Sequence, residues 1–473
     1  MPGDSSKPKP IGHVIAVQGP VVDIKFKSLE DLPSIYGVIQ VKTIDDKEIF
    51  LEVAEHRSNH VARCISINST QNLQRHAKAV SMGHPIQVPV GEAMFGRAIN
   101  VLGQPIDQKG PIPTKEYRSI RKSTMETTVR SKAIASRKFE LLGTGIKIID
   151  LLFPLVKGGK SGILGGAGLG KSVITLEIIH NIVTQHKGTC VFVGAGERVR
   201  EGNELFWELH DQGILPKTMI VFGQMNEPPG ARYGVAMTGV TLAETLQKEN
   251  NDVLLFIDNV FRFIQAGAEI STLLGRVPSE TGYQPTLISE ASEFHERIRS
   301  GDGLSGSVTS IEAVYVPADD LTDPAVVAIF TFLDSLMVLS RERVQLGLYP
   351  AIDPLQSSCA NLDSEIVGKR HYQVSQEVLR TFYKYEELRK LVLVIGLDEL
   401  SPADRLIYDR ARKLQNFLTQ PFSVAEAYTG KKGHYVPIEE TLRGCEEILA
   451  GRHDKRAEEE FYMIGPLAFN AQS

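Results

Sequence analysis

The sequence predicts a multidomain protein: an N-terminal β-barrel, a central α/β domain with a mainly parallel sheet, and a C-terminal α-helical bundle. Three observations support this prediction. Short β-rich segments with frequent turn residues fill roughly the first ninety residues, apolar strands then alternate with helical stretches, and helical periodicity dominates the end. A chain of 473 residues is long enough for several domains. We expect their boundaries at 1–90, 91–365 and 366–473.

The N-terminal part contains several short runs of β-branched and apolar residues. Residues 11–27 form one such run, which Gly19-Pro20 interrupts. Further strands are expected at 38–41, 49–53, 61–67 and 85–89. Several short strands separated by turns favour a small barrel or a sandwich, whose simplest role is to hold subunits together.

The central part alternates between strand and helix. Strands are expected at 161–164, 189–193, 219–222 and 252–258, and helices at 173–184, 197–212 and 239–249. Such alternation predicts a parallel sheet with helices on both faces. After residue 365, helices are expected at 375–393, 402–418 and 439–450, which predicts the helical bundle.

Charge and cysteine content exclude several classes of function. The net charge of −5 and the pI of about 6.2 argue against a general nucleic-acid binder, which usually carries a basic field. Cys64, Cys190, Cys359 and Cys445 form no CxxC pair, so we expect no cysteine metal site or redox motif, and a reducing compartment.

The chain shows neither a signal-peptide core nor a membrane span. Its first ten residues are polar and rich in proline, and no apolar core follows them. The longest nearly apolar run, 325–333, is about half of what a span needs. We expect a soluble protein that meets a membrane only through partners.

The strongest chemical signal is Gly165-Gly166-Ala167-Gly168-Leu169-Gly170-Lys171-Ser172, followed by Val173. It matches GxxxxGK[ST] between a predicted strand and a predicted helix, which is the context of a phosphate-binding loop. Glycines let the backbone wrap phosphates, and N–H groups at a helix start attract anions. Lys171 is expected to reach the β and γ phosphates of ATP, and Ser172 to offer its hydroxyl to Mg²⁺.

Two further groups follow predicted strands. Asp258 ends the apolar strand 252–258 and is expected to orient Mg²⁺, although strands often end in a turn aspartate. Gly194-Ala195-Gly196-Glu197-Arg198-Val199-Arg200-Glu201 follows the strand 189–193. There Glu197 would polarise water, Arg198 would bind phosphate charge and Glu201 would reach the water shell of the metal. A capped, salt-bridged first turn of a helix explains this segment equally well.

Four longer segments carry a family resemblance. They are Gly223-Gln224-Met225-Asn226-Glu227-Pro228-Pro229-Gly230-Ala231-Arg232, Leu255-Phe256-Ile257-Asp258-Asn259-Val260-Phe261-Arg262-Phe263, Gly282-Tyr283-Gln284-Pro285-Thr286-Leu287 and Tyr315-Val316-Pro317-Ala318-Asp319-Asp320-Leu321-Thr322-Asp323-Pro324. With them the chain resembles, over almost its whole length, the catalytic β subunit of F-type rotary ATP synthases. The resemblance implies a barrel crown, a RecA-like nucleotide domain and a helical foot.

The resemblance also implies roles for single residues toward Mg²⁺ and ATP or ADP. Lys171 and Arg198 would bind phosphate, Ser172 would ligate Mg²⁺, and Glu197 would position water. Asp258 would lie at the metal and Arg262 near the γ-phosphate. The adenine pocket would be formed by Tyr349, Phe422 and Tyr428, with Tyr349 stacked on the base. For each aromatic residue, core packing is the alternative.

Partners follow from the same resemblance. An arginine from a neighbouring alpha subunit would complete the site, in a hexamer of three α and three β subunits around a central γ shaft. A peripheral stalk and an ion-translocating membrane sector complete the assembly, which we expect on the cytoplasmic face of a bacterial or archaeal cell membrane. Asp398-Glu399-Leu400-Ser401-Pro402-Ala403-Asp404 stands where the family usually has DELSEED, so Asp398, Glu399 and Asp404 are the predicted shaft contacts.

Several positions depart from the usual family pattern. Val199 and Ser172 replace threonines, Tyr428 replaces a phenylalanine, and residues 300–306 are unlike the common form. These departures indicate a diverged branch that resembles the second-copy, sodium-associated synthases of some bacteria and archaea.

Four other interpretations remain. A non-catalytic α subunit is disfavoured by Glu197 and the segment 317–324, and a flagellar, secretion or V-type ATPase by the segments 223–232 and 282–287. A RecA-like nucleic-acid motor would need a basic or aromatic channel. A pure nucleotide-binding module would require Glu197 to be inert.

Overall fold

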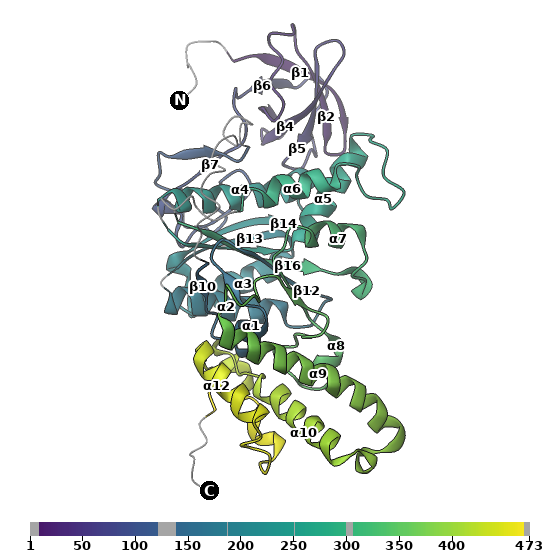
Figure 1. Ribbon diagram of the computed structural model, residues 1–473. Coiled ribbons are helices and arrows are strands. Elements are labelled where there is room, and N and C mark those ends of the chain that lie inside the picture. The colour runs from purple at the N-terminus through teal and green to yellow at the C-terminus, as the bar shows by residue number, and fades with distance from the viewer. Residues whose placement is uncertain (1–8, 122–138, 187, 250, 299–305, 468–473) are drawn as a thin grey trace. The chain divides into compact units, whose positions relative to one another are not determined.

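The computed structural model describes residues 9–121, 139–186, 188–249, 251–298 and 306–467 (Figure 1). The unusual segment 300–305 and most of the polar N-terminus lie outside these residues. The chain divides into two compact units. The first comprises Met1–Ala135, Thr189–Val308 and Leu321–Phe332, and the second comprises Ser136–Gly188, Thr309–Asp320 and Leu333–Ser473.

The first unit begins with a closed six-stranded barrel, as the sequence predicts. Its strands are β1 (Ile11–Gln18), β2 (Val21–Lys25), β3 (Val38–Lys42), β4 (Glu48–Arg57), β5 (Val61–Ser66) and β6 (Lys78–Ser81). They close in the order β1-β2-β5-β4-β3-β6, and every neighbouring pair is antiparallel. Inward-facing apolar residues such as Val14, Ile39 and Leu51 are fully buried and form the core.

The predicted strand at 85–89 is not part of this barrel. Instead β7 (Gln87–Pro89) pairs with β9 (Tyr117–Ser119), and β6 closes the barrel between β1 and β3. Pro85 and Pro89 lack the N–H that a strand paired on both sides must donate, which accounts for the difference. β6 has only four residues, too few for a clear periodic signal.

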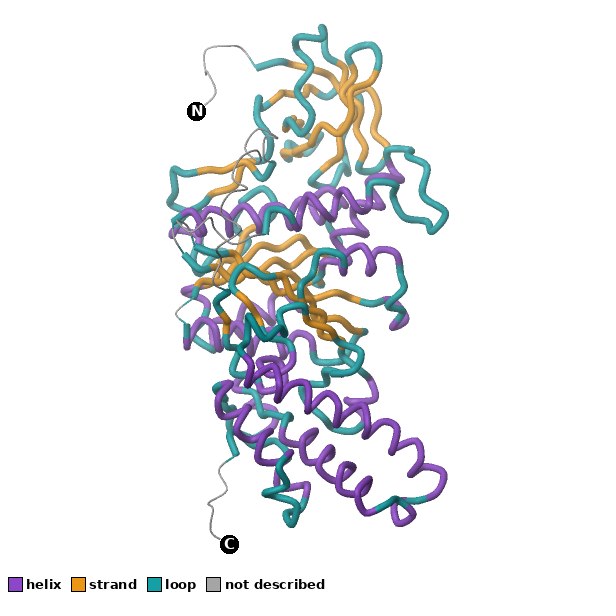
Figure 2. Tube along the Cα trace, viewed as in Figure 1, coloured by secondary structure: helices purple, strands orange, loops and turns teal. Residues whose placement is uncertain are grey.

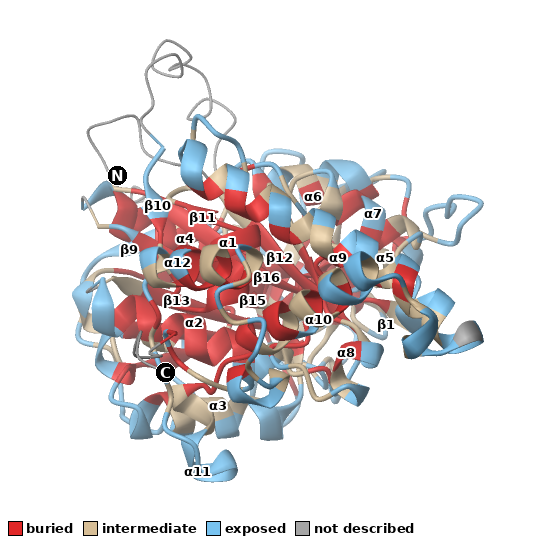
Figure 3. Ribbon diagram, turned by 60° about the horizontal axis from the view of Figure 1, so that its bottom comes forward, coloured by how far each residue is buried: buried red, intermediate tan, exposed pale blue. Residues whose placement is uncertain are grey.

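The first unit also carries four parallel strands in the order β15-β13-β14-β8. They are β8 (Ala98–Ile99), β13 (Thr189–Glu197), β14 (Thr218–Gln224) and β15 (Val253–Asp258). β13 and β15 are buried along almost their whole length (Figure 3). The helices of this unit are α3 (Val199–Asp211), α4 (Pro229–Lys248), α5 (Val260–Leu273), α6 (Leu287–His295) and α7 (Pro324–Phe330). α4 packs across β13, β14 and β15.

Helix α4 begins ten residues before the predicted start at Gly239. Its glycines are typical helix breakers, but they stand where the helix touches its neighbours. A β-carbon on Gly230 would lie 2.6 Å from the Ser66 carbonyl oxygen, and one on Gly239 would lie 2.1 Å from Val193. Pro229 in the first turn is compatible with a helix start, because no intrahelical N–H bond is lost there.

In the second unit the strand order is β18-β17-β12-β16. These strands are β12 (Lys160–Gly165), β16 (Val308–Tyr315), β17 (Ser335–Val338) and β18 (Ser358–Cys359). β12 is parallel to both β16 and β17, and β18 is antiparallel to β17. Helix α2 (Lys171–Gln185) follows β12 and packs against it, so the predicted strand–loop–helix is present. Helix α1 (Lys147–Leu152) lies between the short paired strands β10 (Leu141–Leu142) and β11 (Leu155–Val156) in the chain.

The C-terminal part of the second unit is helical, as expected. α9 (Lys369–Ile395), α10 (Pro402–Phe417) and α12 (Ile438–Leu449) pack against one another (Figure 2). α9 starts six residues earlier than predicted, directly after Gly368, and Gly396 follows its last residue. Among the described residues, no helix combines the length and apolar character that crossing a bilayer requires.

Candidate functional site

The candidate phosphate loop links β12 to α2 in the second unit. β12 ends at Gly165 and α2 begins at Lys171. Gly168 and Gly170 have φ angles of +77° and +89°, a region that side chains with a β-carbon rarely adopt. Because Gly170 precedes the helix and has no side chain, the first-turn N–H groups receive no cap from it. The loop therefore has the backbone of an anion-binding site.

The Lys171 ammonium lies over this loop. Nζ donates to the carbonyl oxygen of Gly165 and, at 3.2 Å, to that of Gly166. It also lies 5.5 Å from the centre of the Tyr315 ring. An ammonium held by loop carbonyls can exchange them for phosphate oxygens, which are stronger, charged acceptors.

An ion pair that sequence reasoning missed lies beside the loop. Arg341 Nε donates to Asp319 Oδ2 at 2.8 Å. A β-carbon on Gly166 would lie 2.5 Å from Asp319 and 2.7 Å from Arg341, so any larger residue there would displace the ends of these two side chains. Arg341 comes shortly after β17. A charged residue just after a buried parallel strand is the signal in the sequence that could have assigned Arg341 to the site.

The second candidate group lies in the first unit, at the carboxyl ends of β13 and β15. Glu197 ends β13, Asp258 ends β15, and the two strands are direct neighbours in register, Gly194 opposite Asp258. The expectation that a helix begins at Glu197 is wrong. Gly196 has a φ of +71° within a strand irregularity, and α3 starts only at Val199. Glu197 is thus fixed by a strand end and not by a helical turn.

The surroundings of Glu197 favour its protonated form. Burial, the charge of Asp258 and a hydrogen bond with Glu201 raise the pKa of Glu197 to about 8, while Arg262 opposes the shift. Arg262 Nε lies 3.9 Å from Glu197 Oε1 and has no hydrogen-bond partner among the described residues. A carboxyl group in such a place can hold or accept a proton near neutral pH.

Arg198 and Arg262 differ in their surroundings. The Arg198 side chain is 71% exposed and lies 3.6 Å from Glu201 across one helical turn. Arg262, on α5, is less exposed and packs against Gly196, where an added β-carbon would lie 2.9 Å from the arginine side chain.

A cavity of about 320 Å³ adjoins Glu197 and Arg198. Its aromatic walls are Phe206, Trp207 and Phe222.

The predicted Mg²⁺ ligands are all oxygen donors. Ser172 offers a hydroxyl, and Asp258 and Glu201 offer carboxylates. Mg²⁺ prefers such hard donors and usually takes one or two protein oxygens, with phosphates and water as the other ligands. These side chains therefore fit the ion. Among the described residues, no three histidine, cysteine or acidic side chains cluster as a metal cage.

The predicted adenine residues lie in the second unit with different exposure. Tyr349 is 40% exposed and Tyr428, on α11 (Glu426–Thr429), is 83% exposed, whereas Phe422 is buried at 7%. The backbone N–H of Gln420 donates to the Tyr349 carbonyl at 3.0 Å, so Tyr349 adjoins the segment that leads to Phe422. The buried ring of Phe422 also matches the core-packing alternative.

The predicted shaft residues lie just after α9 and in the first turn of α10. Asp398 and Glu399 belong to a short 3-10 helix, and the side chain of Asp398 is 93% exposed, 3.4 Å from Arg405. Asp404 is already engaged. Its carboxylate accepts from Ser401 Oγ at 2.7 Å, while its N–H donates to the same oxygen and caps α10.

Three family models match the chain. Residues 14–83 match the beta-barrel domain of the ATP synthase alpha/beta family, and residues 145–359 match the nucleotide-binding domain of that family. Residues 360–456 match the C-terminal domain of V and A type ATP synthase. These matches span most of the chain, and they confirm the three-part fold and an ATP synthase or ATPase activity. The chain therefore belongs to the ATP synthase alpha/beta family, with the domains of a catalytic subunit.

Proposed function

We propose that this chain is the catalytic β subunit of a rotary ATP synthase, which makes ATP from ADP and phosphate or hydrolyses ATP. The observation that carries the proposal is the placement of Glu197. It is a carboxyl group at the end of a buried parallel strand, beside Asp258 and Arg262, and its pKa of about 8 lets it exchange a proton near neutral pH. A non-catalytic subunit would not need a proton-accepting carboxyl group there, so Glu197 favours a catalytic subunit.

The proposed chemistry divides between the two groups of residues. The loop 165–172 holds the β and γ phosphates, with the Lys171 ammonium exchanging loop carbonyls for phosphate oxygens. Glu197 orients the water that attacks the γ-phosphate and receives its proton. Arg198 and Arg262 stabilise the negative charge that develops. Ser172, Asp258 and Glu201 would hold Mg²⁺, which when bound neutralises charge on the phosphate oxygens.

The proposed partners complete this chemistry. Glu197 and Arg198 border an open cavity, which supports completion of the site by an arginine of a neighbouring alpha subunit. The exposed Asp398 and Glu399 would contact the central γ shaft, and a peripheral stalk would hold the hexamer static. Coupling to H⁺ or Na⁺ transport would occur in a separate membrane sector, with this chain on the cytoplasmic face of the membrane.

One observation favours a second candidate. Because the C-terminal region matches the V and A type model, the chain is alternatively the catalytic subunit of a V- or A-type enzyme. The residues and the chemistry would be the same. The two candidates differ in which partner subunits activate the chain.

The test is steady-state hydrolysis of Mg·ATP by the purified chain, alone and then mixed with its cognate alpha subunit. We expect negligible turnover alone and a large rise on assembly, because a charge supplied in trans is worth about 10³–10⁵ in rate. Full turnover by the isolated chain would replace the rotary proposal with a self-assembling ATPase. A rise only with V- or A-type partners would select the second candidate.

A further inference from the structure

A buried glutamate on α2 connects the phosphate loop to the segment that carries Phe422. Glu177 lies six residues after Lys171 and is completely buried. Its Oε2 accepts the backbone N–H of Val424 at 3.1 Å, and the N–H of Ser423 also hydrogen-bonds to its carboxylate. Phe422 immediately precedes these two residues. The carboxylate thus holds the backbone next to a predicted adenine-pocket residue.

The other oxygen of Glu177 is fixed as well. Asn181, one turn further along α2, directs its amide to Glu177 Oε1 at 3.5 Å and to the Thr144 carbonyl at 2.8 Å. Both side chains are buried, at 0% and 2% exposure. A buried carboxylate with partners on both oxygens has little freedom to rotate. The N–H groups of Ser423 and Val424 that it binds are therefore held at a fixed position relative to α2.

The same segment is fixed at its other end by Gln420. Its Nε2 donates to the Gly145 carbonyl at 2.7 Å, and its Oε1 accepts the Lys147 N–H at 2.9 Å. Its own N–H binds the Tyr349 carbonyl. Phe422 therefore stands on a short stretch of chain anchored two residues before it by Gln420 and one to two residues after it by Glu177.

We propose that Glu177 is a positioning residue for the nucleotide base, because it fixes the Phe422 segment to the helix that begins at the phosphate loop. The inference rests on the proposed function, in which Phe422 borders the adenine. It assigns Glu177 no contact with the nucleotide. Its carboxylate sets the spacing between the base pocket and the phosphate loop, so losing it affects ligands with a base more than ligands without one.

The test compares Mg·ATP with Mg·tripolyphosphate, which offers the phosphates without a base. Both are titrated calorimetrically into the full chain and its variants. Glu177→Ala should weaken ATP binding about tenfold and leave tripolyphosphate binding within about twofold, because one or two hydrogen bonds to a charged acceptor are lost. Glu177→Gln keeps an acceptor for the Val424 N–H, so its ATP affinity should fall between those of the wild type and the alanine variant.

Ser375→Ala is the matched control. Ser375 is also buried in the second unit and donates to the Leu151 carbonyl at 2.8 Å. It belongs to α9, and this hydrogen bond involves neither Glu177 nor Gln420. The Ser375→Ala substitution should change the affinity for each ligand by no more than about twofold, because it removes one neutral hydrogen bond remote from the loop.

The outcomes separate the inference from the proposed function. Equal weakening of both ligands in the two Glu177 variants, or no weakening in either, would overturn the positioning role. Should Glu177→Ala fail to fold, the ratio of the two affinities in Glu177→Gln decides the question. If the wild-type chain bound ATP no more tightly than tripolyphosphate, the adenine pocket itself would be wrong, and the inference would fall with it.

Discussion

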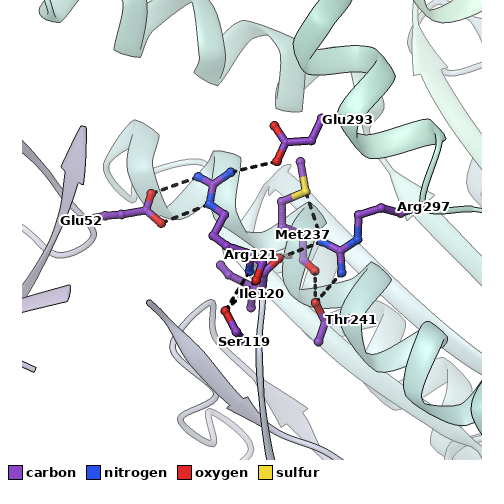
Figure 4. Close-up of polar contacts among 8 residues, drawn as sticks. All are labelled: Glu52, Ser119, Ile120, Arg121, Met237, Thr241, Glu293 and Arg297. Carbon is purple, nitrogen blue, oxygen red and sulfur yellow. Dashed lines mark hydrogen bonds and ion pairs between the residues drawn. The ribbon is translucent and has the colours of Figure 1, made fainter. Parts of the chain in front are cut away.

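The Arg121 guanidinium donates two hydrogen bonds to the Glu52 carboxylate, at 3.2 and 3.1 Å, and so ties β4 of the barrel to the chain that follows β9 (Figure 4). The guanidinium also lies 4.3 Å from the centre of the Tyr36 ring. The side chains of Arg121 and Glu52 are 9% and 15% exposed. Glu293 on α6 lies 3.6 Å from the same arginine but is 47% exposed.

Replacing Arg121 by methionine should destabilise the first unit strongly. Glu52 would keep its charge in a buried place without a partner, and breaking such a pair from one side costs about 3–5 kcal/mol. The midpoint of urea unfolding, followed by circular dichroism, measures the loss. Glu293→Gln removes only the exposed contact and should cost less than about 1 kcal/mol. Equal losses in the two variants would show that the buried pair with Glu52 stabilises the protein no more than the exposed contact with Glu293.

Replacing Glu197 by glutamine should abolish turnover and preserve binding. The amide keeps the shape of the side chain but cannot accept the proton of water, and such proton transfer contributes about 10²–10⁴ to the rate. Hydrolysis by the assembled complex should fall by that factor, while the Kd for Mg·ATP should change no more than a few fold. Glu204→Gln, on the exposed face of α3, the helix that follows Glu197 in the chain, is the control and should leave both values unchanged. Retained turnover in Glu197→Gln would show that Glu197 does not take part in the hydrolysis.

The main architecture could be predicted because it depends on local signals. Short β-rich runs, the alternation of strands with helices, and the glycine loop before Lys171 are all visible within a few residues. The ends of elements were less predictable. Gly239 suggested a helix start, whereas α4 uses its glycines for close contact with β13 and the barrel.

Long-range pairing explains what the sequence could not show. Arg341 and Asp319 are 22 residues apart, Glu52 and Arg121 are 69 apart, and Glu177 and Val424 are 247 apart. No periodicity links such residues, since their contact depends on how the strands are ordered. A glutamate in the middle of a helix, such as Glu177, looks like a solvated residue until its burial is known.

Replacing Lys171 by methionine should weaken phosphate binding. A hydrogen bond to a charged group contributes about 1.5–3 kcal/mol, so the affinity for tripolyphosphate should fall about 10- to 150-fold. Isothermal titration at low salt measures this change. Lys160→Met is the matched control, because Lys160 begins β12, the strand that leads into the loop, but lies outside the loop itself; the affinity of this variant should stay within about threefold of the wild type. Equal losses of affinity in the two variants would show that Lys171 acts through the overall electrostatic potential of the protein and not through a specific contact in the loop.

Replacing Asp150 by asparagine should change how stability depends on pH. Burial raises the pKa of the Asp150 carboxyl to about 6, although Thr144 and Gly145 donate three hydrogen bonds to it. The folded state therefore binds a proton more tightly than the unfolded state. This contribution is fully present below the unfolded pKa of 3.8 and is lost as the pH rises through 6.

The measurement is the difference in unfolding free energy between the wild type and Asp150→Asn from pH 4 to pH 8. The wild type should lose up to about 3 kcal/mol relative to the variant over this range. Most of the loss should occur before pH 7. A difference that does not change with pH would mean that Asp150 stays ionised in the folded protein.

Separate substitutions in the segment 398–404 should distinguish shaft contact from helix capping. Asp398 and Glu399 take no part in the α10 cap, whereas Asp404 accepts from Ser401, the residue that caps α10. Replacing Asp398 and Glu399 together by alanine should reduce ATP-driven ion transport per ATP hydrolysed in the reconstituted enzyme, with no change in thermal stability. Asp404→Ala should instead lower the stability of α10 by about 0.3–1 kcal/mol, since it removes a carboxylate from a helix start. If the double variant transports ions as efficiently as the wild type, these two acids do not transmit torque, and contact with the shaft must depend on other side chains between α9 and α10.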